Sequence, residues 1–156
     1  MKKVSLDTWI QLLGMVGLLG GLIFVGLEMR QSQRIAMAAQ QADRFATITA
    51  GITPFYEIGV DWHSIAYLNR PDLSEQFSIG EASARNNYHL SLFLFENDYF
   101  QYTQGLMPDD VWAAKLQSLT FFYNQCNHRD LMDRRKLYFS SDLRDVIDSL
   151  PDNCAE

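Results

Sequence analysis

Residues Thr8–Arg34 read TWIQLLGMVGLLGGLIFVGLEMRQSQR, and the 20 residues from Thr8 to Leu27 include no charged side chain. A helix of that length rises about 30 Å, which matches the hydrocarbon thickness of a lipid bilayer. Trp9 and Gln11 lie near one end, where aromatic and polar side chains of a membrane helix reach the headgroups. The segment predicts a single membrane span over about residues 8–27, within an anchor formed by residues 1–28.

Two other interpretations of this segment stay open. A buried helix of a soluble core needs a polar face or a larger protein around it, and no polar period occurs between Leu12 and Leu27. A cleaved signal peptide would fit Lys2 and Lys3, but the apolar run is long and Glu28-Met29-Arg30 is no small-residue cleavage site. The sequence favours a retained single-pass span over both.

Three glycines, Gly14, Gly17 and Gly21, share one face of the predicted span. Small residues at this spacing let a second helix approach closely. Two interpretations stay open: this face contacts a second copy of the chain or a partner membrane protein, or the segment is a lone glycine-rich span.

Basic residues flank the span in nearly equal numbers. Lys2 and Lys3 precede it, whereas Arg30, Arg34 and Arg44 follow it. Because basic residues are enriched on the cytoplasmic side of membrane proteins, this margin of one favours a cytoplasmic location for the domain after the span.

The chain after the span is acidic. Residues 1–28 hold two lysines and two acidic residues, so the excess of 17 Asp and Glu over 11 Lys and Arg lies in residues 29–156. An acidic domain repels phosphate backbones, and no basic stripe offsets that repulsion. Nucleic acid is therefore not an expected partner. The lipid bilayer is an expected partner because of the predicted span.

Helical patterns continue through the rest of the chain. We expect a stem helix to about Ala50 and a new helix from Thr53-Pro54, because threonine is a favoured N-cap and proline a favoured first helical residue. Ser78-x-x-Glu81 has the form of a capping box, and Gly105 lies where a helix end favours a left-handed residue. Further helices are expected from Pro108, from Arg129 and from Ser140-Ser141-Asp142.

Short connections between these helices indicate antiparallel neighbours. The predicted fold is all-α: an N-terminal transmembrane helix continues into a stem helix, and a small antiparallel helical bundle follows. Residues 29–150 form the helical domain in this prediction, and residues 151–156 form a C-terminal tail.

The two cysteines, Cys126 and Cys154, are far apart in the sequence and have no paired spacing. This pattern indicates neither a disulfide framework nor a zinc site. We expect two free thiols, one semi-buried and one on the tail.

Three segments carry a family resemblance: the span ending GLIFVGLEMRQSQR, then LFLFENDYFQYTQGLMPDDVW, then RRKLYFSSDLRDVIDSL. Together they resemble a family of bacterial single-span membrane proteins of unknown function, whose middle segment has the form FENxYxQYxxGLxxxxxW. The chain departs from the family at Glu28-Met29, at Ser141-Asp142, and between Cys126 and Leu137, where a tryptophan-rich segment is missing. The resemblance implies attachment to a bacterial inner membrane and this architecture, but no activity.

The segment FLFENDYFQY, residues 93–102, sets polar side chains among large aromatic ones. A carboxylate desolvated by such neighbours has a raised pKa and can act as an acid, a base or a ligand-binding group. The candidate binding residues are Glu96, Asn97, Gln101, Tyr102 and Trp112. The alternative interpretation is structural: Glu96 pairs with an arginine, and Asn97 or Gln101 bonds to neighbouring backbone.

No metal or cofactor motif accompanies this segment. The Glu-x-x-His pairs of ferritin-like bundles and the glycine-rich phosphate loops are missing. The histidines, His63, His89 and His128, are isolated in the sequence, and we expect each to be exposed or hydrogen-bonded. We expect no cofactor, no metal and no catalytic residue. The sequence favours a membrane-anchored interaction or scaffold module, and the alternative is a membrane-proximal enzyme or ligand-binding protein with a pocket around Glu96.

Overall fold

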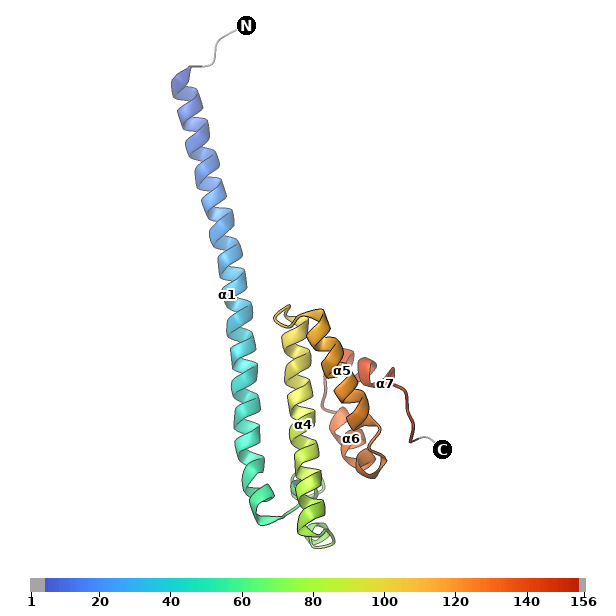
Figure 1. Cartoon of the computed structure of the whole chain (residues 1–156). Helices are drawn as coiled ribbons and strands as arrows, with labels where there is room; N and C mark the ends of the chain where they lie inside the picture. Colours follow the sequence, from blue (N-terminus) through green and yellow to red (C-terminus); the bar gives the residue numbers. More distant parts are fainter. Residues whose placement is uncertain (1–4, 155–156) are drawn as a thin grey trace. The chain divides into compact units, whose positions relative to one another are not determined.

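A computed structural model describes residues 5–154, and all regular elements in that range are helices (Figure 1). They are α1 (Leu6–Ile58), α2 (Trp62–Ala66), α3 (Pro71–Ser74), α4 (Ile79–Thr103), α5 (Asp109–Tyr123), the 3₁₀ helix η1 (Cys126–His128), α6 (Arg129–Lys136) and α7 (Ser141–Asp148). This confirms the predicted all-α class. The chain divides within α1 into two units, Met1–Met37 and Ala38–Glu156, whereas the sequence predicted the boundary at residue 28.

The first part of α1 is apolar and uncovered. Over one window of 18 residues its mean hydropathy is 2.2, and none of that window is buried. Gly14, Gly17 and Gly21 have no atom of another element within 4 Å of the position that a Cβ would take. Helix α1 is thus long and apolar enough to cross a membrane.

The expected helix start at Thr53-Pro54 is wrong. Pro54 lies inside α1, which continues to Ile58. Proline lacks the backbone N–H and crowds the preceding turn, but only about one helical turn follows Pro54, so a single backbone hydrogen bond is lost near the helix end. The hydroxyl of Thr53 donates to the carbonyl oxygen of Thr49 at 2.8 Å and adds a bond in the turn before the proline.

Helix α1 ends at Ile58, and Gly59 directly after it has a φ of +66°. The N–H of Val60 donates to the carbonyl oxygen of Phe55 at 3.0 Å, which closes a Schellman motif. A Cβ on Gly59 would lie 2.8 Å from a side-chain carbon of Ile79 at the start of α4. Both the backbone conformation and this contact therefore require glycine.

Two predicted ends of α4 are confirmed. The Ser78 hydroxyl accepts from the N–H of Glu81 while the Glu81 carboxylate accepts from the N–H of Ser78, so the capping box is complete. Gly105 has a φ of +71°, and the N–H of Leu106 donates to the carbonyl oxygen of Gln101 at 3.0 Å. The same glycine motif thus ends both long helices.

Helix α4 is the centre of the bundle. It packs against α2, α5 and α6, and it runs antiparallel to α5 (Figure 1). The main apolar core is filled from α4 to α7 and the connection between α6 and α7, by Tyr88, Leu92, Phe95, Leu119, Tyr123, Leu131, Met132, Phe139, Leu143 and Ile147. Among the described residues, α1 contributes nothing to this cluster. The bundle is therefore complete without the apolar segment.

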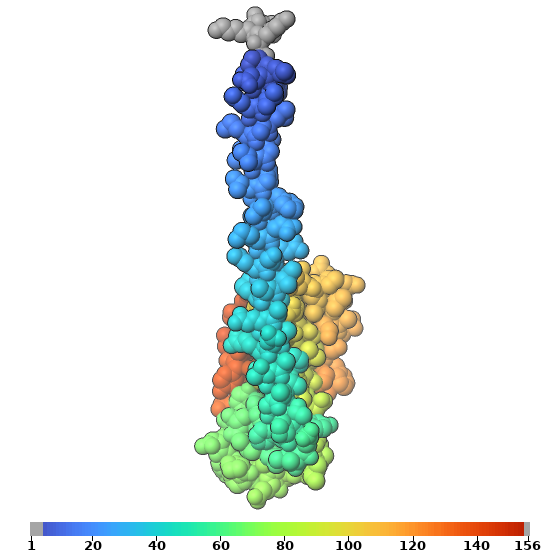
Figure 2. All heavy atoms as spheres, turned by 90° about the vertical axis from the view of Figure 1, so that its left-hand side faces the viewer, coloured from blue at the N-terminus to red at the C-terminus, as the bar shows by residue number. Residues whose placement is uncertain are grey.

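Residues 38–58 of α1, here called the stem, lie beside α4 and run antiparallel to it (Figure 1). Only Ala38 and Ile52 of the stem are fully buried. The Nε2 atom of Gln101 donates to the Ala38 carbonyl oxygen at 3.0 Å. Figure 2 shows the opposite face of the stem uncovered by other elements. The stem thus contacts the bundle along one face only.

The prediction of two free thiols is wrong, because Cys126 and Cys154 form a disulfide with their Cα atoms 5.4 Å apart. Helices α6 and α7 lie between the two cysteines in the sequence and return the chain to the end of α5. Residues 151–154 form hydrogen bonds with the bundle. A carboxylate oxygen of Asp152 accepts from Arg129 at 2.6 Å, and the side-chain oxygen of Asn124 accepts from the N–H of Asn153 at 2.7 Å.

Candidate functional site

Glu96 of α4 pairs with Arg135 of α6. The Arg135 guanidinium lies 4.0 Å from the ring centroid of Phe93 and 4.8 Å from that of Phe139, and its side chain is only 6 % exposed. Burial raises the pKa of Glu96, and Arg135 opposes this shift. The arginine partner of the structural interpretation is therefore present.

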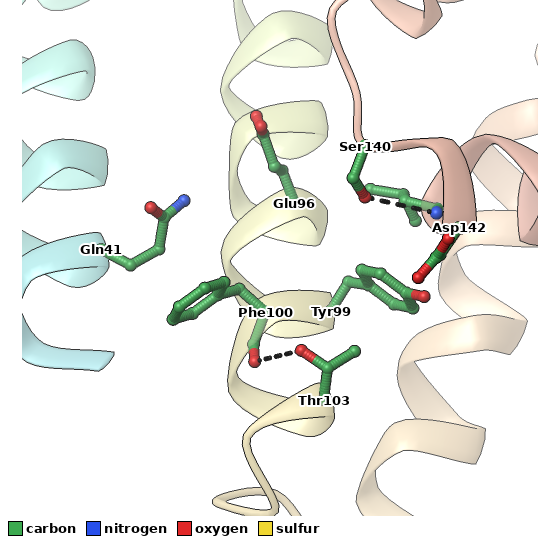
Figure 3. Close-up of a pocket in the computed structure, with 8 residues that line it drawn as sticks. Gln41, Glu96, Tyr99, Phe100, Thr103, Ser140 and Asp142 are labelled. Atoms are coloured by element: carbon green, nitrogen blue, oxygen red, sulfur yellow. Dashed lines mark hydrogen bonds between the residues drawn. The ribbon is translucent and has the colours of Figure 1, made fainter. Parts of the chain in front are cut away.

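Two pockets meet at Glu96, and we call them together the Glu96 groove. The larger, of about 330 Å³, is lined by Gln41, Glu96, Tyr99, Phe100, Thr103, Ser140, Asp142 and Leu143 (Figure 3). The smaller, of about 160 Å³, is lined by Gln41, Arg44, Phe45, Ile48, Phe93, Glu96 and Arg135. The groove therefore runs between the stem and α4, outside the filled bundle core.

The larger pocket joins aromatic rings to carboxylates. In Figure 3 the ring of Phe100 points toward Gln41 of the stem, and the ring of Tyr99 points toward Asp142 at the start of α7. Neither lysine nor arginine lines this pocket. Carboxylates beside ring faces form an environment that suits a cation.

The five predicted binding residues do not converge on this groove. Tyr102 and Trp112 stack with ring centroids 5.0 Å apart and hold the α4–α5 turn. Gln101 bonds to the stem backbone, as the structural interpretation expected. The buried Oδ1 of Asn97 finds no hydrogen-bond partner among the described residues. Only Glu96 of the five lines the groove.

The structure brings together two histidines that the sequence left isolated. The Nδ1 of His63 and the Nε2 of His89 lie 3.0 Å apart, and the two rings stack. Both residues are buried, and Tyr67 and Trp62 pack around them. Burial lowers the pKa of both histidines, and that of His89 falls to about 2. The pair is therefore neutral at pH 7.

A buried ion network lies next to this pair. Asp61 is completely buried, caps α2 through the N–H of Ser64, and accepts from the Nε of Arg85 at 3.1 Å. Arg85 also donates to Asp130 of α6 at 2.9 Å. Sequence reasoning missed this network, although Asp61 had the N-cap position as a local signal. Its groups are mutually satisfied, so its role is structural.

The described residues 5–154 contain no group of three or more His, Cys, Asp or Glu side chains placed to hold a metal ion. His63 and His89 supply two nitrogens without a third ligand of that kind.

No family model, curated protein or solved structure matches this chain. The resemblance to bacterial single-span proteins therefore stays a prediction, as does a role of Gly14, Gly17 and Gly21 in helix association.

Proposed function

We propose that this chain is a membrane-anchored helical interaction module. Residues 8–27 span a bilayer in this proposal, and the larger pocket of the Glu96 groove takes up a basic side chain of a protein partner. The observation that carries the anchor is that the apolar segment is unburied while the bundle already has its own core. Removing one large aliphatic side chain from water is worth about 2 kcal/mol. A run of exposed side chains such as Leu18 and Leu22 therefore favours lipid over water.

Membrane fractionation of the full-length chain tests the anchor. We expect the protein to stay with membranes after an alkaline wash and to be released by detergent. The double variant Leu18→Arg/Leu22→Arg places two charges in the span, each costing about 3 kcal/mol on insertion, so it should leave the membrane fraction. Phe121→Arg, at an exposed position of α5, is the matched control and should remain. Wild-type protein in the detergent-free supernatant would contradict the anchor.

The chemistry of the groove supports a basic partner. Asp142 supplies a carboxylate that forms no ion pair among the described residues, whereas Arg135 already pairs with Glu96. Tyr99 and Phe100 supply aromatic rings. A lysine or arginine side chain satisfies both kinds of surface at once. The acidic excess of the domain attracts such a partner over a longer range.

Site-specific photo-crosslinking in native membranes tests the groove. A photo-reactive residue at Thr103, which lines the larger pocket, should form a protein adduct whose linked peptide contains lysine or arginine. The same residue at Ser118, exposed on α5, is the positional control and should not. Asp142→Arg should abolish the adduct, and Asp110→Arg, an acidic residue outside the groove, should preserve it. An adduct that survives Asp142→Arg would refute the charge-based proposal.

A small amine ligand is the second candidate, because the larger pocket has the volume of a small-molecule site. Thermal unfolding of the detergent-solubilised chain with simple alkylamines separates the two. Stabilisation that disappears in Asp142→Arg, without a protein adduct at Thr103, would favour the small ligand.

A further inference from the structure

The Cys126–Cys154 disulfide joins two surface positions. Cys126 is exposed and Cys154 half-buried, so reductants reach the bond from solvent. Cytosolic glutathione and thioredoxin keep accessible protein thiols reduced, whereas oxidising compartments preserve such bonds. The presence of this bond therefore indicates whether the domain folds in a reducing or an oxidising compartment.

Hydrogen bonds also hold the segments that carry the two cysteines next to each other. Arg129 donates to Asp152 at 2.6 Å, and the N–H of Cys154 donates to the same carboxylate at 2.9 Å. The side-chain amide of Asn124 donates to the Pro151 carbonyl oxygen at 3.0 Å. The folded bundle thus places the Cα atoms of the two cysteines 5.4 Å apart, within the range that a disulfide spans.

We infer that the helical domain lies on the oxidising, extracytoplasmic side of the membrane, where the folded bundle brings Cys126 and Cys154 together and they are oxidised. The residues directly before the span, including Lys2 and Lys3, then lie in the cytoplasm, where basic flanking residues are favoured. This orientation is the opposite of the cytoplasmic location that the count of basic residues on the two sides of the span favoured. The inference does not depend on the anchor, because a cleaved signal segment would deliver the bundle to the same side.

The oxidation is a two-electron step. The two thiols lose two protons and two electrons as the Sγ–Sγ bond forms, and a disulfide-bearing thiol oxidase accepts them and becomes a dithiol. The exchange passes through a mixed disulfide between the oxidase and one of the two cysteines. The exposed Cys126 offers the accessible sulfur for that attack.

Thiol trapping tests the redox state of the full-length chain. Cells of a bacterial host are quenched in acid, free thiols are blocked with N-ethylmaleimide, and the protein is then treated with a polyethylene glycol maleimide with or without prior reduction. We expect two mass-shifted adducts per chain only after reduction. Protein that is fully blocked before reduction would overturn the inference.

Labelling with a membrane-impermeant maleimide tests the side. Gln117→Cys adds an exposed thiol on α5, and Ser5→Cys adds one before the span, each in the otherwise native chain. In spheroplasts we expect Gln117→Cys to react at once and Ser5→Cys to react only after permeabilisation. The reverse pattern would overturn the inference. Labelled Gln117→Cys protein in the soluble extracellular fraction would support the oxidising side while contradicting the proposed anchor, so the two failures are distinguishable.

Discussion

Arg135 is the residue at which the candidate groove meets the bundle core. Its guanidinium pairs with Glu96 and lies over the rings of Phe93 and Phe139. Removing the carboxylate from a buried ion pair destabilises a protein far more than replacing both partners by apolar residues, because the remaining charge has no water to solvate it. Glu96 therefore stabilises the bundle whether or not a partner occupies the groove.

We predict that Glu96→Gln lowers the free energy of unfolding by about 2 kcal/mol, a value below that of a fully buried pair because the Glu96 side chain is 29 % exposed. Denaturant titration of the detergent-solubilised chain measures this loss. Asp72→Asn removes the exposed carboxylate that pairs with Arg70 and should leave stability unchanged. Equal effects of the two substitutions would contradict the role assigned to Arg135.

The His63–His89 pair gives the domain a stability that depends on pH. Burial lowers the pKa of both rings in the folded state, whereas the pKa of a histidine in the unfolded chain is about 6.5. Below that pH the unfolded chain binds more protons, so stability is lost as the pH falls. The expected slope is up to about 1.4 kcal/mol per pH unit for each histidine.

Thermal unfolding between about pH 7.5 and pH 5 measures this slope. His89→Gln removes the more deeply shifted ring and should flatten the profile of the variant relative to the wild type. His63, Arg85, Arg135 and His128 all disfavour a charge on His89, so none of them rescues its protonation. Identical profiles for wild type and variant would show that the ring does not titrate in this range.

At the scale of the elements, local signals predicted helix ends well when one residue and its near neighbours decide them. The capping box at Ser78 and the glycine end at Gly105 are of this kind, since the hydrogen-bonded partners in each lie within five residues of each other. Pro54 shows the limit of such reasoning. Proline favours a helix start but is tolerated near a helix end, and the actual end depends on Gly59, whose close contact with Ile79 is non-local.

Gly59 and Gly105 form a matched pair for testing this point. Both have positive φ, but a Cβ would collide with Ile79 only at Gly59, and open space surrounds Gly105. We predict that Gly105→Ala costs about 1 kcal/mol for the left-handed backbone, and that Gly59→Ala costs at least about 1 kcal/mol more. Denaturant titrations measure both losses from the shift in the unfolding midpoint, provided that the slope of the free energy of unfolding against denaturant concentration stays the same.

The excess cost at Gly59 should depend on the side chain it meets. Ile79→Ala removes the carbons that lie 2.8 and 2.9 Å from the added Cβ, so the double variant Gly59→Ala/Ile79→Ala should be less destabilised than the sum of the single variants. Additive losses would mean that the backbone conformation alone makes Gly59 necessary.

At the scale of the whole molecule, the sequence predicted the all-α class and the apolar segment but not the pairings between distant residues. Glu96 and Arg135 are 39 positions apart, and His63 and His89 are 26 apart. Tertiary packing alone brings such residues together, so spacing could identify Glu96 as a candidate without identifying its partner. The same limit made Cys126 and Cys154 look like unrelated thiols.

The disulfide closes a loop over a sequence separation of 28 residues that contains α6 and α7, and with them Leu131 and Ile147 of the core. Closing a loop of that length in the unfolded chain is worth about 3.5 kcal/mol by the chain-entropy relation. We predict that Cys126→Ser, Cys154→Ser and the double variant each lower the free energy of unfolding by this same amount, because all three lose one bond. Denaturant titration of the oxidised wild type against the variants measures it, and reductant should lower the wild type to the level of the variants while leaving the double variant unchanged. A wild type insensitive to reductant would contradict this prediction, because the bond would then contribute nothing measurable to the free energy of unfolding.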